Sequence, residues 1–263
     1  MPTDWPGLGG AVVLVTGGSR GVGAGIGQEF REVGATVVSC GRRPPPRPDP
    51  EFIGCDVRKP EQVGALIDTV LARHGRLDVL VNNAGGAPPR AASAGSPEFH
   101  AGVVRLNLLA PLLVSQAANA VMQGQDRGGA IVMISSVSGR RPSPGTAAYG
   151  AAKAGLENLT ASLAVEWAPK VRVNALAVGM VRTEQAHLHY GDDAGIAAVG
   201  AGVPLGRLAE PAEVGRCAVF LASPLASYVS GATLAVHGGG ERPAFLAAAN
   251  AVRPNLAERR QPE

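Results

Sequence analysis

Short apolar runs rich in valine and isoleucine recur along the chain, and segments with helical periodicity separate them. In the segments 22–33 and 63–71, apolar residues recur every three or four positions, which is typical of amphipathic helices. The apolar runs themselves are four to eight residues long or close to it, a length that favours strands. They predict strands at residues 11–16, 36–40, 51–54, 79–82, 130–135, 171–176 and 232–236.

The alternation of these elements predicts the fold class. Continuous apolar strands separated by helices form a parallel sheet that helices cover on both faces. We therefore expect a doubly wound α/β fold with seven parallel strands, in one domain at residues 1–240 followed by a tail at 241–263. The proline-rich segment 42–50 is too short for a crossover helix, so one helix of the alternation is expected to be missing there.

Composition and charge narrow the class of protein. The 263 residues, 46% of them hydrophobic, are enough for one large core. A net charge of +3, with no run of more than two basic residues, gives little support to a nucleic-acid partner. Cys40, Cys55 and Cys217 are widely spaced and are expected to be reduced packing residues of a cytoplasmic protein. No export signal and no uninterrupted apolar stretch of about 18 residues is present, so we expect no membrane span.

A glycine-rich turn follows the first predicted strand. Its pattern, Thr-Gly-x-x-x-Gly-x-Gly from Thr16 to Gly23, leads directly into the first predicted helix. Glycines let the backbone approach a pyrophosphate, and the amides at a helix N-terminus stabilise the anion. Such clusters are also ordinary turn chemistry, and the pattern differs from the common G-x-G-x-x-G fingerprint. The position in the first strand-helix unit favours nucleotide binding.

Ser136, Tyr149 and Lys153 suggest proton-transfer chemistry. Ser136 ends a predicted strand, and Tyr149 and Lys153 are four residues apart on a predicted helix, so they share a face. A free phenol loses its proton near pH 10, and a neighbouring ammonium group lowers that pKa. A Tyr and a Lys at this spacing are more often a surface pair, so their role depends on the rest of the chain.

These motifs occur together in one order. The glycine-rich turn, Asn82-Asn83-Ala84-Gly85, Asn107, Ser136 and Tyr149-x-x-x-Lys153 follow the spacing of the short-chain dehydrogenase/reductase family, and the resemblance covers about residues 8–240. It implies a Rossmann fold with Tyr149 as general acid/base, Ser136 as hydrogen-bond donor, and Lys153 as the group that lowers the tyrosine pKa and holds the nicotinamide ribose. Asn107 would anchor a proton-relay water. The implied cofactor contacts are Gly17, Ser19, Arg20, Gly21, Val22, Gly23, Arg42, Asp56, Val57, Asn83, Ala84, Gly85, Tyr149, Lys153, Gly179, Val181 and Thr183.

The resemblance also implies an activity and an assembly. The expected reaction is the interconversion of a ketone and a secondary alcohol, with a 3-oxoacyl thioester, a ketosteroid or another alicyclic ketone as candidate small-molecule substrates. A non-catalytic dinucleotide-binding scaffold is the alternative from another class. Family membership implies a homotetramer in which the helices carrying Asn107 and Tyr149 and the last strand make the contacts. His187 and His189 are too few ligands for a metal, so no metal site is expected.

The end of the second strand bears on the choice of cofactor. Enzymes that prefer NAD place an acidic residue there to bind the ribose 2′-hydroxyl. Here Gly41 stands at that position and Arg42 follows, while Arg20 lies in the glycine-rich turn. Arginines suit a 2′-phosphate, so NADP(H) is favoured and NAD(H) remains the alternative. Asp56 either contacts the adenine or is a plain charge at a helix N-terminus.

Three further segments carry expectations. Residues 183–203 are expected to form a glycine-hinged loop that closes over a moderately apolar substrate. Arg140 and Arg141 either contact an anionic substrate group or are exposed solubilising charges. A short helix is expected near residues 245–252.

Overall fold

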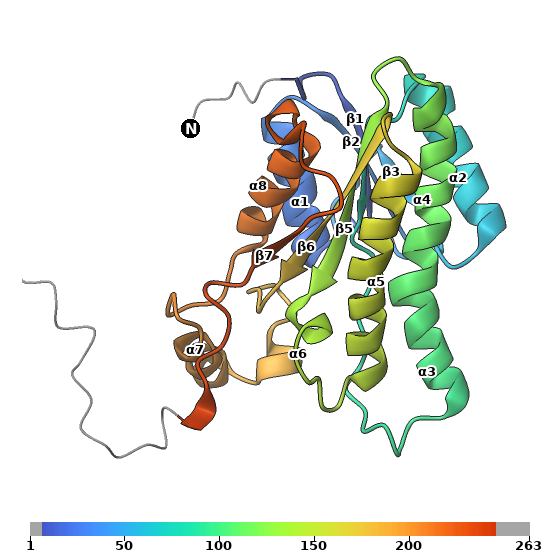
Figure 1. Ribbon diagram of the computed structural model, residues 1–263. Helices are drawn as coiled ribbons and strands as arrows, with labels where there is room; N and C mark the ends of the chain where they lie inside the picture. The colour runs from blue at the N-terminus through green and yellow to red at the C-terminus, as the bar shows by residue number, and fades with distance from the viewer. Residues whose placement is uncertain (1–6, 246–263) are drawn as a thin grey trace, which may run out of the picture.

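A seven-stranded parallel sheet forms the centre of the protein. The computed structural model describes residues 7–245, and Figure 1 shows the sheet with its covering helices. The strand order is β3-β2-β1-β4-β5-β6-β7. The strands are β1 (Val12–Thr16), β2 (Thr36–Gly41), β3 (Phe52–Gly54), β4 (Val79–Asn82), β5 (Gly129–Ser136), β6 (Val171–Val178) and β7 (Thr233–Val236).

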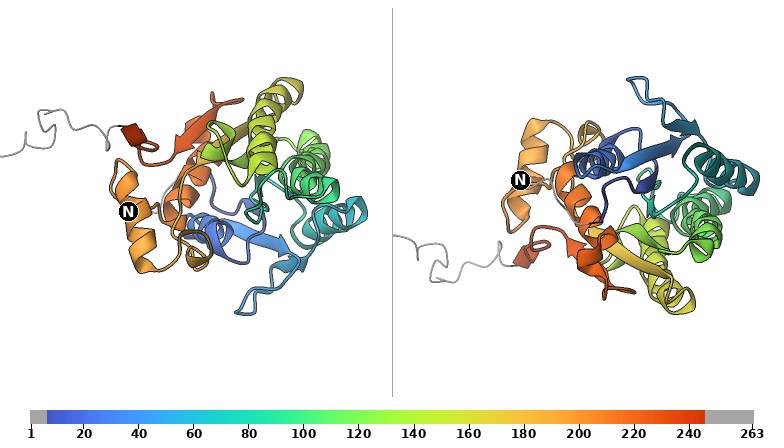
Figure 2. Two further views of the ribbon diagram at one scale, coloured as in Figure 1. Left: turned by 90° about the horizontal axis from the view of Figure 1, so that it is seen from below. Right: turned by 90° about the horizontal axis from the view of Figure 1, so that it is seen from above.

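Two helical layers cover the sheet, as the end-on views in Figure 2 show. Helices α1 (Gly21–Glu32) and α8 (Pro211–Ala222) pack on one face around Ile26 and Phe30. Helices α2 (Pro60–His74), α4 (Ala110–Gly124) and α5 (Ala147–Glu166) pack on the other, around Leu66, Met122 and Leu156. The inner strands are mainly apolar because both faces of the sheet are buried there.

The topology places a crevice above the centre of the sheet. β1 pairs in parallel with β2 on one side and with β4 on the other, so the direction of winding reverses between β1 and β4. In open α/β sheets, ligands bind at this switch point, outside the carboxyl ends of the strands. Helices α6 (His187–Tyr190) and α7 (Asp193–Gly202) lie at that end of the sheet (Figure 1).

The predicted fold class is confirmed, including all seven strands. The strand ends differ by one or two residues, and no helix lies between β2 and β3, as the proline-rich segment predicted. The prediction of a loop at 183–203 was wrong, because α6 and α7 occupy most of that segment. Asp192 caps α7 by accepting the amide of Gly195 at 3.0 Å. An aspartate at this position predicts a helix start, but the glycines of the segment favoured a loop in the sequence analysis. The expected helix at 245–252 lies almost entirely outside the described residues.

A long apolar helical stretch runs through α3 (Pro97–Val104), a π-helical turn η1 (Arg105–Leu109) and α4. The stretch Pro97–Gly124 is long and apolar enough to cross a membrane, by length and composition only. An 18-residue segment within it has a mean hydropathy of 1.4, and 39% of that segment is buried. Its buried residues, among them Val114, Ala118 and Met122, belong to the core beneath the sheet. Its apolar character therefore matches that of a core-facing helix.

Candidate active site

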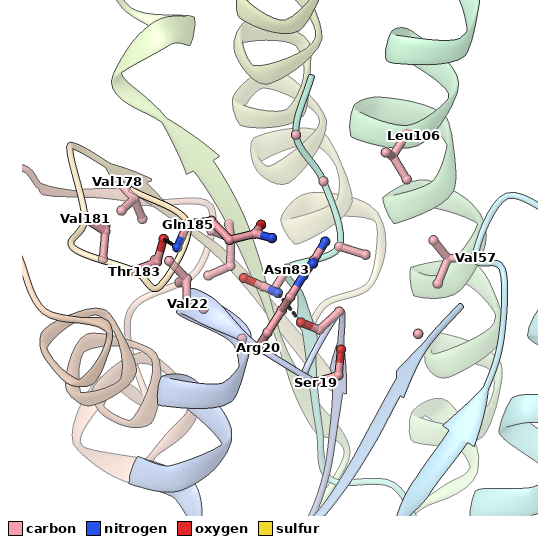
Figure 3. A pocket seen from close by; sticks show the side chains of 18 of the residues that line it. Ser19, Arg20, Val22, Val57, Asn83, Leu106, Val178, Val181, Thr183 and Gln185 are labelled. Carbon is pink, nitrogen blue, oxygen red and sulfur yellow. Dashed lines mark hydrogen bonds between the residues drawn. The ribbon is translucent and has the colours of Figure 1, made fainter. Parts of the chain in front are cut away.

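A cleft of about 780 Å³ opens at the carboxyl ends of β1, β4, β5 and β6. Thr183, Gln185 and Val22 lie on one side of it, and Val57 and Leu106 on the other (Figure 3). With one exception, every site residue predicted from the sequence lines this cleft: Gly17, Ser19, Arg20, Gly21, Val22, Gly23, Arg42, Asp56, Val57, Asn83, Ala84, Gly85, Ser136, Tyr149, Lys153, Gly179, Val181 and Thr183.

The glycine-rich turn after β1 is tied to the loop after β4. The Thr16 Oγ1 accepts the amides of Asn83 and Ala84, each at 3.0 Å, and Asn83 Nδ2 donates to the carbonyls of Thr16 and Gly17 at 2.9 and 3.1 Å. Gly17 has φ +66°, and a Cβ there would lie 3.0 Å from the Ala84 Cα. A Cβ on Gly23 would lie 2.3 Å from the Gly17 carbonyl oxygen.

This geometry fits a dinucleotide. The absence of side chains at Gly17 and Gly23 lets the backbone of the turn close tightly at the start of α1, where amide groups have no carbonyl partner within the helix. A pyrophosphate suits such a position because the amides and the helix dipole both favour an anion. The residues present therefore form a cradle for a nicotinamide dinucleotide.

Asn107 is the exception among the predicted site residues. It lies in the π-helical turn η1 and is fully buried. Its Nδ2 donates to the carbonyls of Gly86 at 3.0 Å and Val103 at 2.9 Å, and its Oδ1 accepts the Gly86 amide at 2.8 Å. Leu106 lines the cleft instead. The amide of Asn107 thus holds the loop after β4, and the structure does not place it against the cleft.

Ser136, Tyr149 and Lys153 converge on the cleft from β5 and α5. Ser136 is the last residue of β5, and α5 presents the other two side chains one helical turn apart. Lys153 is only 3% exposed, and its Nζ donates to the Ile134 carbonyl at 2.7 Å. The Nζ also lies 5.5 Å from the centroid of the Tyr149 ring. All three residues line one cleft, and burial of Lys153 shows that Tyr149 and Lys153 are not an exposed surface pair.

Burial controls the protonation of this pair. Desolvation raises the pKa of Tyr149 above its usual value, and a hydrogen bond with Ser136 offsets part of that rise. Desolvation also lowers the pKa of Lys153 to about 8. The expectation that Lys153 lowers the tyrosine pKa is therefore not met in this structure, because burial of the phenol has the larger effect. A neutral phenol beside an ammonium group is the favoured state near pH 7.

A polar network braces α5 against β5 beside the trio. The buried Ser135 hydroxyl lies 3.0 Å from Glu157 Oε1 and 3.2 Å from the Lys153 carbonyl, so its hydrogen is shared between two acceptors. Arg140 Nε donates to Glu157 Oε2 at 2.9 Å. Arg141 forms an ion pair with Glu241 at 2.7 Å. Both arginines are thus paired with carboxylates and stay 39% exposed, so contact with an anionic substrate group or a solubilising role stays a prediction.

The far end of the cleft, beyond β2, is rich in arginine. Arg20, Arg42 and Arg43 line it and are exposed. Asp56 lies among them, and its carboxylate accepts hydrogen bonds from Arg58 Nε at 2.8 Å and Arg58 Nη2 at 2.6 Å. That hydrogen bonding, with a smaller contribution from Arg42, lowers the pKa of Asp56 to about 2. The carboxylate is therefore neutralised by a neighbour, which leaves the other three arginines to set the charge of this end.

Three residues on the opposite side were not predicted as site residues. Glu184, Gln185 and His189 line the cleft from the turn after β6 and from α6. Glu184 Oε1 accepts the amide of Gly21, the first residue of α1, at 3.0 Å. The contact between Glu184 and Gly21 joins residues 163 positions apart, so no local sequence pattern predicts it. The sequence marked Glu184 only as the neighbour of Thr183.

Comparisons with known proteins define the family. A family model described as enoyl-(acyl carrier protein) reductase matches residues 17–241. The chain is 37% identical to a 3-oxoacyl-[acyl-carrier-protein] reductase of Chlamydia muridarum, over 86% of this chain and 95% of that protein. It is 38% identical to an L-fucose dehydrogenase of Oryctolagus cuniculus, over 88% of this chain and 85% of the relative. The structure of an aldohexose dehydrogenase of Thermoplasma acidophilum superposes with a TM-score of 0.84 at 32% identity, covering 94% and 98% of the two chains.

The fold and the cleft define a dinucleotide-binding oxidoreductase. More narrowly, the chain belongs to the short-chain dehydrogenase/reductase family. It is an enzyme that acts on alcohol or ketone groups of small molecules and uses NAD(P)(H).

Proposed function

We propose that this protein is an NADP(H)-dependent oxidoreductase that interconverts a ketone and a secondary alcohol, with Tyr149 as general acid/base. The observation that carries the proposal is the meeting of Ser136, Tyr149 and Lys153 in the cleft that also contains the glycine cradle. The cofactor supplies the hydride when bound. The protein has to orient the carbonyl, stabilise the charge that develops on its oxygen and deliver a proton.

Ser136 and Tyr149 are suited to those tasks. Both residues line one cleft, so a carbonyl oxygen placed against their hydroxyl groups meets two donors. The raised pKa of Tyr149 keeps its proton in place until the substrate oxygen becomes basic enough to take it. Lys153, a cation below about pH 8, balances the phenolate that remains. The same groups serve alcohol oxidation in reverse.

The arginines at the far end of the cleft support NADP(H). Gly41 ends β2 where an acidic residue would bind a free 2′-hydroxyl, and Arg42 follows it. Arg20 and Arg43 line the same end. Because Asp56 is already paired with Arg58, its charge adds little repulsion toward a phosphate. Guanidinium groups bind phosphate oxygens in a bidentate manner, which suits the additional phosphate of NADP(H).

The substrate side of the cleft supports a polar substrate over the moderately apolar one expected from the sequence. Gln185 and His189 line it, whereas Leu188 is not among the lining residues and is 63% exposed. Amide and imidazole groups bind hydroxyl-bearing molecules through hydrogen bonds. Similarity to an L-fucose dehydrogenase and an aldohexose dehydrogenase adds an aldose to the candidates, beside 3-oxoacyl thioesters and alicyclic ketones.

The test is a substrate panel followed by one variant. Wild-type protein is assayed with NADPH and NADP⁺ against aldoses, a 3-oxoacyl thioester and alicyclic ketones, with NADH and NAD⁺ in parallel. With the best substrate, Tyr149→Phe is expected to reduce turnover by about 10³-fold or more and to leave NADPH binding within twofold. Tyr228→Phe is the matched control, since Tyr228 is fully exposed. Substantial turnover in Tyr149→Phe, or none in wild type with any substrate, contradicts the proposal.

We also infer a homotetramer. Leu109 at the end of η1 and Val165 near the end of α5 are 50% and 81% exposed, and Leu234 on the edge strand β7 is 38% exposed. Apolar side chains on two adjacent helices and on a sheet edge are suited to contacts between copies of the chain. Light scattering coupled to gel filtration tests this inference, and a monomer mass at micromolar concentration would refute it.

A further inference from the structure

The Glu184 carboxylate lies in the cleft against the N-terminus of α1, at the glycine-rich turn. Its Oε1 lies 3.0 Å from the amide nitrogen of Gly21, which donates to it. Gly21 begins α1, a helix of twelve residues, and has φ +54°. The first amides of a helix point at whatever lies before its N-terminus and favour a negative charge there. The carboxylate of Glu184 satisfies this preference from within the chain.

The backbone around Glu184 is ordered by its own hydrogen bonds. Thr183 Oγ1 accepts the amide of Gln185 at 3.3 Å, and the Thr183 carbonyl accepts the amide of Ala186 at 3.0 Å. The Thr183 side chain also packs over Gly21, since a Cβ on Gly21 would lie 3.6 Å from its Cγ2. The turn that leads into α6 therefore contacts the glycine-rich turn at Gly21 through Thr183 and Glu184.

We propose that Glu184 is an intramolecular competitor of the cofactor pyrophosphate for the Gly21 amide, and that it thereby weakens cofactor binding and speeds cofactor release. The inference rests on the proposed function, since it concerns the same cleft. A phosphate at the Gly21 amide and the Glu184 carboxylate cannot share one hydrogen, and their negative charges repel each other. Binding therefore requires the carboxylate to leave, and its return assists dissociation.

The expected size of the effect is moderate. Both partners of the contact are exposed to solvent, so water screens much of the attraction and the repulsion. Interactions of a charge with a helix N-terminus correspond to about twofold to fivefold in an equilibrium constant, with repulsion between the two anions added. We expect Glu184→Gln to bind NADPH about fivefold to tenfold more tightly than wild type and to release it correspondingly more slowly.

The experiment measures binding without turnover. NADPH fluorescence titration gives Kd, and stopped-flow displacement gives the dissociation rate, for wild type, Glu184→Gln and Glu184→Ala. Glu166→Gln is the matched control, because it removes the same charge from an exposed position at the far end of α5. Inorganic pyrophosphate, titrated as a competitor of NADPH, tests whether the gain belongs to the pyrophosphate position.

The outcomes separate this inference from the proposed function. Tighter binding of NADPH and of pyrophosphate in both Glu184 variants, with Glu166→Gln unchanged and the gain reduced at high salt, supports the competition. Equal or weaker binding in the Glu184 variants overturns it, while saturable binding by wild type leaves the proposed function intact. Wild-type protein that binds neither NADPH nor NADH overturns both. A gain of affinity also cannot arise from a variant that merely folds poorly.

Discussion

Replacing Lys153 with methionine tests the energetic consequence of burying a cation in the active site. Lys153 is 3% exposed, and burial lowers the pKa of its ammonium group from 10.5 to about 8. With one pH unit worth 1.36 kcal/mol, keeping this group charged in the folded protein costs about 3 kcal/mol at pH 7. Methionine has a similar length and no charge, so it removes this cost.

The net gain is smaller than the whole cost. The Lys153 Nζ donates to the Ile134 carbonyl at 2.7 Å, and losing that bond removes about 1 to 2 kcal/mol. We therefore expect Lys153→Met to raise the free energy of unfolding by about 1 to 2 kcal/mol at pH 7 without cofactor. For a chain of this size that is a rise in Tm of roughly 3 to 6 °C. Turnover should be lost.

The pH dependence has a defined sign. Below about pH 8 the lysine is charged in both the folded and the unfolded protein, so the full cost is present. Between about pH 8 and 10.5 the folded protein releases this proton before the unfolded chain does, and wild-type stability rises relative to the variant. The advantage of Lys153→Met should therefore be largest below pH 8 and should reverse near pH 10.5, where most of the charge cost is gone and the lost hydrogen bond to Ile134 remains.

Thermal and urea unfolding at pH 7 and pH 10.5 provide the measurement. Lys59→Met is the control, since Lys59 is exposed and should show little change at either pH. A Lys153→Met variant that is less stable than wild type at pH 7 would refute the reasoning. So would a gain that is equally large at both pH values, because the effect would then not come from the charge.

Three other substitutions test separate parts of the cleft. Arg42→Ala should weaken NADPH binding about tenfold and leave NADH within twofold, measured by fluorescence titration, because only NADPH carries the additional phosphate. Gly23→Ala should abolish saturable cofactor binding, since its Cβ would lie 2.3 Å from the Gly17 carbonyl oxygen, and calorimetry should also show a lower Tm. Glu157→Gln should lower kcat about tenfold with NADPH affinity unchanged, because it weakens the bond to Ser135 that braces α5; a changed Kd with unchanged kcat would contradict this.

The sequence predicted the fold and many of the residues that line the cleft because both follow from local patterns. Most strands are apolar runs rich in valine or isoleucine that can be recognised alone, and parallel topology brings the strand ends together. Glu184 could not be found in this way, since its partner Gly21 lies 163 residues earlier. Asn107 fits the family spacing, yet the π-helical turn directs its amide to Gly86, and a sequence pattern does not show that direction.

The protonation states of the trio depend on tertiary burial, and they explain why stability and catalysis conflict at Lys153. The i, i+4 spacing led to the expectation of a lowered pKa for Tyr149, but the closed environment raises it and lowers the pKa of Lys153. The site therefore retains the phenol proton until substrate oxygen accepts it, and retains a buried cation to balance the charge that results.

A cation that balances a phenolate must be present before the phenolate forms. Before the phenolate forms, the closest contacts of the Lys153 ammonium group are the Ile134 carbonyl and the Tyr149 ring, and neither is an anion. The destabilisation by Lys153 and its proposed role in proton transfer thus follow from the same burial.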